Sequence, residues 1–167
     1  LSMTDLLQAR IELELVRRDV PYGAHARDAK RTLYEIADPF LRFWFRYVEP
    51  NRSRLEARQV AAVAREMAPS FPLHVSRTWE ELARASVARL RCHGRTWRPA
   101  SRWWGSGLDR RPMEIDVVAD SDDGKFVLLG EASWSKTANA KALLQRLRHK
   151  AENGEYTSTG PVSGRGR

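Results

Sequence analysis

Cysteine and long apolar runs are scarce in this chain of 167 residues. Its single cysteine, Cys92, cannot form an internal disulfide, which fits a reducing cytoplasm. No apolar run approaches the roughly 20 residues that a helix needs to span a bilayer. We therefore expect a cytoplasmic protein that is not embedded in a membrane.

Motifs of several enzyme classes are also missing. The four histidines are scattered without metal-ligand spacing, and with one cysteine they exclude a zinc site of the usual kind. The chain has no Gly-x-x-x-x-Gly-Lys-Ser/Thr loop, so it is not itself a P-loop ATPase. It also lacks the Gly-x-Ser-x-Gly elbow of serine hydrolases.

Lysine is rare among the cations, since 24 of the 29 basic residues are arginine. The net charge is +8, but residues 114–140 carry six acids against two bases, and the segments on either side are basic. Carboxylates that hold a metal, flanked by cations that hold phosphate, suit a site for phosphodiesters. The alternative is that the basic segments are ordinary solvated faces.

The first third of the chain predicts a small helix and hairpin. Ser2 or Thr4 can cap a helix that carries Leu6, Leu7 and Ile11 on one face. Residues 13–20 and 31–36 alternate loosely and predict two paired strands. A helix followed by two strands is the C-terminal half of a winged-helix unit.

An aromatic helix is expected next. Asp38 can cap it, with Pro39 at its first position and Pro50-Asn51 at its end. Residues 40–48 are apolar on nearly all sides, which predicts a buried helix or one clamped between two domains. The remaining elements are expected as helices at 53–67, 78–91 and 139–150, strands at 96–97, 102–104, 113–119 and 125–133, and turns at 105–107 and 120–124.

Carboxylates stand on two of these apolar strands. Glu114 and Asp116 lie on the first, while Glu131 lies on the second, two residues before Ser133. Burying a charged carboxylate costs free energy unless an opposite charge pairs with it. Hard cations such as Mg²⁺ bind carboxylate oxygens and can supply that charge. If the strands pair through the 120–124 turn, Asp116 and Glu131 converge and could share one Mg²⁺.

Two stretches carry a family resemblance. Glu114-Ile115-Asp116-Val117-Val118 with Gly130-Glu131-Ala132-Ser133-Trp134 resembles the PD-(D/E)XK nuclease superfamily. The string from Asp38 to Phe45, with Trp79-Glu80-Glu81 and Trp103-Trp104-Gly105, is similar to the C-terminal region of archaeal-type AAA+/STAND ATPases. In those proteins a P-loop ATPase and a winged helix precede a nuclease-like domain of unknown function.

The resemblance implies metal ligands at Asp116 and Glu131 and a helix-borne accessory acid at Glu80. It also implies a lysine where this chain has Ser133, and serine carries no charge to stabilise a hydroxide or a phosphate. Lys136 has the wrong strand parity, Lys125 lies too far away, and Lys141 belongs to the following helix. Loss of such a charge costs about 10²–10³ in rate.

The sequence therefore predicts an α/β (α+β) fold. We expect a winged-helix remnant at 1–50 and a restriction-endonuclease-like mixed sheet flanked by helices at 51–154. Residues 155–167 are expected to form a disordered or truncated tail. The expected function is nucleic-acid association beside a missing N-terminal ATPase domain, with weakened catalysis. The alternatives are an active Mg²⁺-dependent DNA endonuclease and a non-enzymatic interaction module of the ATPase. The residues expected to contact DNA are Arg102, Arg110, Arg111, Lys136 and Lys141.

Overall fold

The computed structural model describes residues 2–25, 31–135 and 137–154. The chain divides into two compact units. Unit 1 comprises Leu1–Asp19 and Thr32–Thr78, and unit 2 comprises Val20–Arg31 and Trp79–Arg167. The tail expected at 155–167 lies outside the described residues. Within the described ranges, no helix has the length and apolar character needed to cross a membrane.

Unit 1 begins with a capped helix and a hairpin. Helix α1 (Met3–Glu12) is capped by Ser2, whose hydroxyl accepts the backbone N–H of Asp5. Strand β1 (Val16–Asp19) pairs antiparallel with β2 (Leu33–Ile36), which confirms the hairpin. Strand β1 is shorter than the expected 13–20 because α1 runs to Glu12 and Glu14 then turns with φ 56°.

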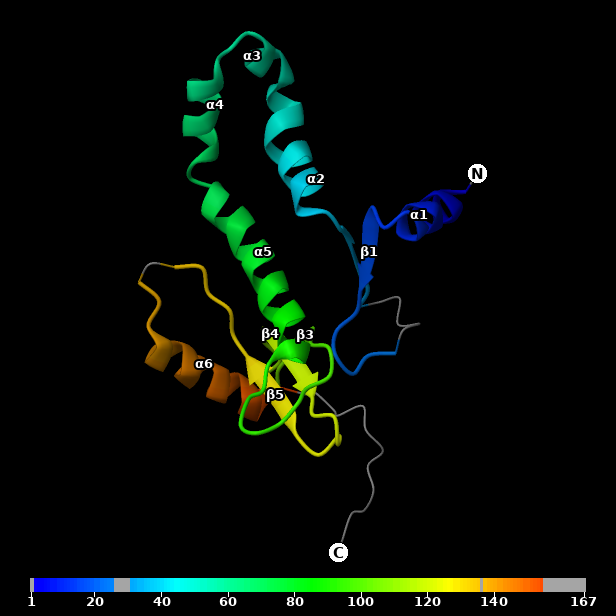
Figure 1. Cartoon of the computed structure of the whole chain (residues 1–167), viewed down its shortest axis with the longest axis vertical. Coiled ribbons are helices and arrows are strands. Elements are labelled where there is room, and N and C mark those ends of the chain that lie inside the picture. Colours follow the sequence, from blue (N-terminus) through cyan, green and yellow to red (C-terminus); the bar gives the residue numbers. More distant parts are fainter. Residues whose placement is uncertain (1, 26–30, 136, 155–167) are drawn as a thin grey trace, which may run out of the picture. The chain divides into compact units, whose positions relative to one another are not determined.

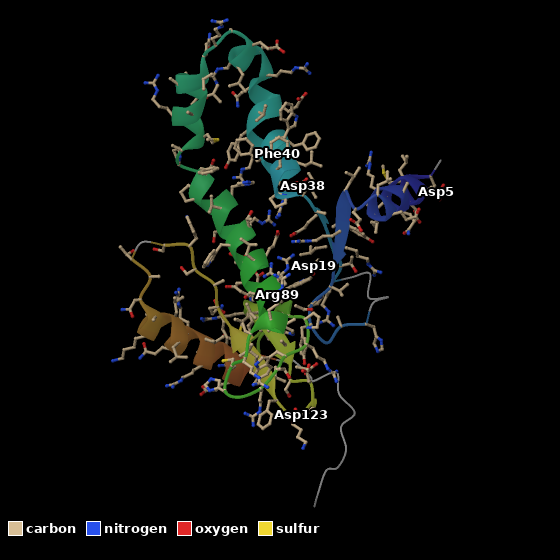
Figure 2. All side chains as sticks on the ribbon, viewed as in Figure 1. Asp5, Asp19, Asp38, Phe40, Arg89 and Asp123 are labelled. Atoms are coloured by element: carbon tan, nitrogen blue, oxygen red, sulfur yellow. The ribbon has the colours of Figure 1, made fainter. Side chains whose placement is uncertain are left out.

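The aromatic segment consists of consecutive stretches of α-, π- and 3₁₀-helix. Asp38 caps α2 (Pro39–Phe43), as expected (Figure 2). The chain continues through the π-helix η1 (Trp44–Val48) and the 3₁₀-helix η2 (Glu49–Asn51) into α3 (Arg52–Glu56). The expectation that Pro50-Asn51 stops the helix is wrong, because Pro50 falls in a first turn where its missing N–H is tolerated.

Burial in this segment is uneven. Tyr47 is 7% exposed, whereas Phe40 and Phe45 are 62% and 57% exposed. The rings of Phe43, Tyr47 and Phe71 form a cluster with the His74 imidazole. The expectation of burial on all sides therefore holds for only one face of the helix within the described residues.

The next helices begin and end at other residues than expected. Arg58 has φ 61°, and this break separates α3 from α4 (Val60–Met67), so 53–67 is not one helix. Helix α5 runs over Phe71–Ser86 rather than from residue 78, and the 3₁₀-helix η3 (Val87–Arg89) follows it. Pro72 lies in the first turn of α5, where proline is compatible with a helix start.

Unit 2 is built on a three-stranded sheet in the order β3-β4-β5 (Figure 1). The strands are β3 (Ser101–Ser106), β4 (Pro112–Asp120) and β5 (Val127–Gly130), and both pairings are antiparallel. Helix α6 (Ala140–Asn153), capped by Asn139, follows the sheet. The α+β class is confirmed, but these described strands form an antiparallel rather than a mixed sheet, and Gly105 lies inside β3 rather than in a turn.

Apolar clusters cover the two faces of this sheet. One contains Val87, Trp97, Val117 and Ala119, with Ala83 of α5 packed against it. The other contains Trp103, Ile115 and Val118, with Leu147 of α6 and Tyr22 packed against it. Each face of β4 is therefore closed by a different helix, and this burial stabilises the unit.

A bulge interrupts β4 between these clusters. Ser101 pairs with Val118 and Trp103 pairs with Ile115, so Asp116 and Val117 together oppose one residue of β3. Such a bulge breaks the alternation of side chains, which is why Ile115 and Val118 share one cluster. Bulges are frequent beside active sites because they redirect a side chain.

Candidate functional site

The candidate site lies where β5 ends beside the bulge of β4. The last ladder pair is Val117 with Gly130. Two residues after Gly130, the backbone N–H of Ala132 donates to Oδ2 of Asp116 at 2.9 Å. The main-chain carbonyl of Asp116 accepts from Nη1 of Arg84 on α5 at 2.8 Å. Side chains thus satisfy these two backbone groups beyond the end of the ladder.

This arrangement corrects the expected strand 125–133. Strand β5 stops at Gly130, so Glu131 and Ser133 lie beyond it. The argument that parity along a strand places Glu131 and Ser133 on one face therefore does not apply. The Ser133 residue is exposed.

A lysine from α6 meets Glu131. Nζ of Lys150 lies 2.6 Å from Oε1 of Glu131, and the two side chains are 25% and 14% exposed. An ion pair with little solvent around it is screened less than a surface pair. The carboxylate that the sequence singled out thus has a cationic partner, and that partner is not at position 133.

Asp116 lies close to Glu131, because its carboxylate accepts from the backbone N–H of Ala132, the residue that follows Glu131. Burial raises the pKa of Glu131 above its usual value, and the negative charge of Asp116 raises it further. The Lys150 ammonium opposes this increase, and so does the more distant Arg146. The structure therefore brings Asp116, Glu131 and Lys150 together at one point.

Sequence reasoning missed Lys150, although the chain contained a signal for it. Leu143, Leu147 and Lys150 follow helical spacing, so they share the inward face of α6. Leu147 packs against the core, and the next position on its face is a lysine. A cation that continues an apolar stripe is a candidate partner for a buried acid on the sheet.

Glu80 lies on α5 in a half-buried position. It precedes Arg84 by four residues, so the two share one face of the helix. Arg84 contacts the backbone of Asp116, which places this part of α5 near the site. The role of Glu80 as an accessory acid remains a prediction.

The residues expected to contact DNA fall in different surroundings. Arg102 is 12% exposed in its side chain, lies 3.5 Å from Glu114, and stacks over the Trp104 ring. Glu114 thus has Arg102 as a partner. Arg110, Arg111 and Lys141 are exposed, while Lys136 lies outside the described residues.

A groove of about 560 Å³ lies between the start of β4 and α6. Lys150 lines it, so the groove adjoins the Asp116–Glu131 pair. Its lining carries three cations, Arg111, Arg146 and Lys150, against the two acids Asp109 and Glu114, and His149 lies beside them. The cations of such a groove can bind an anionic chain.

Metal ligation by Asp116 and Glu131 stays a prediction, and it would use only these two carboxylates. Among residues 2–25, 31–135 and 137–154, no group of three or more His, Cys, Asp or Glu side chains could hold a metal. Mg²⁺ keeps several waters and often binds through one or two carboxylates. The Asp116–Glu131 pair fits this type of site and does not fit a cage made wholly of protein ligands.

Comparison with known proteins gives a family without an assigned activity. The chain is 26% identical over 156 residues to the uncharacterized protein MJECL04 of Methanocaldococcus jannaschii, which covers 90% of this chain and 34% of that protein. The chain thus spans about a third of the length of this relative. No solved structure matches the chain. Residues 44–144 match the family model DUF234, "Archaea bacterial proteins of unknown function", and the chain belongs to this family.

Proposed function

We propose that unit 2 is a nuclease-like domain that binds nucleic acid and has weakened catalysis. The observation that carries this proposal is the meeting of Asp116, Glu131 and Lys150 at the end of β5. Lys150 takes the place of the lysine that the resemblance puts at Ser133. It reaches the site from a helix, so the charge is present although the motif is broken.

The order of elements supports this proposal. A helix, three antiparallel strands and a second helix follow one another, with Asp116 on the middle strand and Glu131 after the third (Figure 1). This is the order in which the PD-(D/E)XK resemblance places its helix-borne acid, its Asp and its Glu. The β4 bulge at Asp116 is a further feature that favours a functional site.

The charge of α6 supports binding of a phosphodiester chain. This helix has four lysines and arginines against one acid, Glu152. Arg146 and His149 line the groove that leads to Lys150. Cations along a groove bind the phosphate backbone without reading its sequence, and this binding weakens steeply with salt.

Weakened catalysis follows from the ion pair. The Glu131 oxygen that bonds Lys150 would also be a metal ligand in an active centre. If Mg²⁺ binds, Asp116 and Glu131 would hold it, and it would supply a bound water of lowered pKa. The ammonium group of Lys150 already compensates the negative charge of Glu131, so we expect weak metal binding and slow cleavage.

DNA binding can be measured by fluorescence anisotropy with a labelled duplex at a series of salt concentrations. We expect an affinity that falls as a power of salt concentration and that Lys150→Met weakens. Arg65→Gln, an exposed substitution on α4 in unit 1, is the control and should leave binding unchanged. A chain that binds no DNA at low salt would contradict the proposal. It would favour the interaction module, with the exposed Phe40 and Phe45 on its docking face.

Efficient Mg²⁺-dependent cleavage is the second candidate function. The negative charge of Asp116, together with burial, raises the pKa of Glu131. A divalent cation bound between the two carboxylates would relieve their repulsion, and this favours the second function. Asp116→Asn keeps an acceptor for the Ala132 amide but removes the charge. Mg²⁺-dependent cleavage of DNA that disappears in this variant, while DNA binding persists, would establish the enzyme.

The setting of the domain is part of the proposal. The relative MJECL04 is about three times longer than the matched segment. We propose that the chain is the C-terminal part of a larger ATPase. Co-expression of the two parts of such a protein, followed by co-purification, tests this association.

A further inference from the structure

Unit 1 contains a small cavity whose walls are basic. Its volume is about 300 Å³, and it is lined by Ile36, Arg42, Phe45, Arg46, His74 and Arg77. Three guanidinium groups and one imidazole thus surround one space, and no carboxylate is among the described residues that line it. Ligand sites begin at about this size.

Glu35 compensates part of the positive charge around this cavity. Glu35 accepts from Arg77 at 3.1 Å and from Arg17 at 2.9 Å, so one carboxylate serves two guanidinium groups. Arg46 stacks on the Tyr47 ring, which fixes its position without neutralising it. Guanidinium groups held around a space prefer an anion that accepts several hydrogen bonds.

The His74 imidazole lies within the influence of these arginines. Its ring packs against Phe43, Tyr47 and Phe71, and the charges that act on it belong to Arg42, Arg46 and Arg77. Burial lowers the pKa of His74 below its usual value, and the three arginines lower it further. A negative charge that enters the cavity would act against this lowering and raise the pKa of His74.

We propose that this cavity binds a phosphate group through Arg42, Arg46, Arg77 and His74. The phosphate can belong to a nucleotide or to the end of a nucleic-acid strand, and both offer the same tetrahedral oxyanion. Phe45, which is 57% exposed, forms an apolar wall beside the cations. Such a wall can pack against the organic part of the ligand.

This site is independent of the carboxylate site in unit 2. All of its lining residues belong to unit 1. Asp116→Asn and Lys150→Met should therefore leave phosphate binding unchanged. Failure of the nuclease-like proposal would not remove this site, and the reverse also holds.

The test is an NMR titration of the whole chain with inorganic phosphate, against chloride at equal ionic strength. His74→Gln assigns the His74 ring resonance. We expect phosphate to shift this resonance and to raise the pKa of His74, because the bound anion stabilises the imidazolium. Sulfate is a second probe, because its own charge does not change over the pH range in which histidine titrates. It should bind more tightly as the pH falls and His74 takes up a proton.

Arg46→Gln tests the cavity directly. Arg46 is an exposed residue, so its replacement should not unfold the unit, and circular dichroism can verify this. We expect about a tenfold loss of phosphate affinity, because the variant lacks one of the charged donors that would bond the anion. The matched control, Arg65→Gln on α4, should bind like the native chain.

Two further ligands distinguish the source of the phosphate. Tighter binding of AMP than of a 5′-phosphorylated oligonucleotide supports a nucleotide, and the opposite order supports a nucleic-acid end. The proposal is overturned if none of these ligands moves the His74 resonance at millimolar concentration. It is also overturned if Arg65→Gln weakens binding as much as Arg46→Gln does.

Discussion

The hydroxyl of Tyr22 donates a hydrogen bond of 2.6 Å to Oδ1 of Asp120, across 98 positions of sequence. Asp120 ends β4 and is 5% exposed. The backbone N–H of Tyr22 also donates to the carbonyl of Arg102 on β3. These bonds explain why the segment from Val20 belongs to unit 2, although the hairpin strands on both sides of it belong to unit 1.

Tyr22→Phe should destabilise unit 2. The substitution removes a donor to a buried carboxylate, and a hydrogen bond to a charged group contributes about 1.5–3 kcal/mol. Unfolding in urea, followed by tryptophan fluorescence, measures the loss, because five of the six tryptophans lie in Trp79–Arg167. Tyr34→Phe, at a tyrosine that is 49% exposed, is the control and should change little.

Lys150→Met should reduce the stability of unit 2 as well as its binding of DNA. It leaves the half-buried Glu131 without its ammonium partner. An unsatisfied partner of this kind costs about 1–3 kcal/mol. Lys141→Met removes an exposed lysine from the same helix and should leave the free energy of unfolding unchanged. Equal effects of the two variants would contradict the importance of the Lys150–Glu131 pair.

The stability of unit 2 should depend on pH through Glu131. The pKa of Glu131 is raised in the folded protein, so the native state binds more protons than the unfolded state. The contribution of this group to the free energy of unfolding is therefore present below the unfolded value of about 4.3 and falls as the pH rises through the higher native value.

Glu131→Gln cannot ionise and should lack this part of the pH dependence. Urea unfolding between about pH 4 and pH 7 compares the two proteins. The difference in unfolding free energy should shift in favour of the glutamine variant as the pH rises, because burial and Asp116 together outweigh Lys150 and disfavour the ionised carboxylate. A shift in the opposite direction would show that Lys150 outweighs burial and Asp116.

Gly130→Ala should disturb the candidate site without changing a polar group. A Cβ at residue 130 would lie 3.2 Å from Cβ of Val117, its partner across the strands. Overpacking of this kind costs about 1–3 kcal/mol. Val117→Ala in the same chain keeps the Cβ that lies at 3.2 Å, so it should recover little of the loss. A double-mutant cycle measured by urea unfolding gives the coupling between the two positions.

Particular residues show how far the sequence could predict the fold. The caps at Ser2, Asp38 and Asn139 were predictable because each supplies a side-chain acceptor for its own helix. The hairpin turn before β5 was predictable from its acids and from Gly124, which has φ 67° (Asp123 is labelled in Figure 2). These features are local, so a few neighbouring residues determine them.

Other features depended on contacts between distant residues. Strand β5 ends at Gly130 because the Ala132 amide bonds to the Asp116 side chain, 16 positions earlier. Arg58 separates α3 from α4 by adopting φ 61°. This conformation is uncommon for arginine, so the sequence does not predict a break at this residue. The alternation of side chains along β4 was predictable only up to the bulge.

The sequence by itself determined the α+β class, the two acids Asp116 and Glu131, and the excess of cations around them, because composition and periodicity are properties of short segments. Only the tertiary structure decided that Lys150 meets Glu131 and that Arg42, Arg46, Arg77 and His74 surround one cavity. The physical reason is that both arrangements join side chains from separate elements. Their distances depend on how helices and strands pack, and no local pattern encodes that packing.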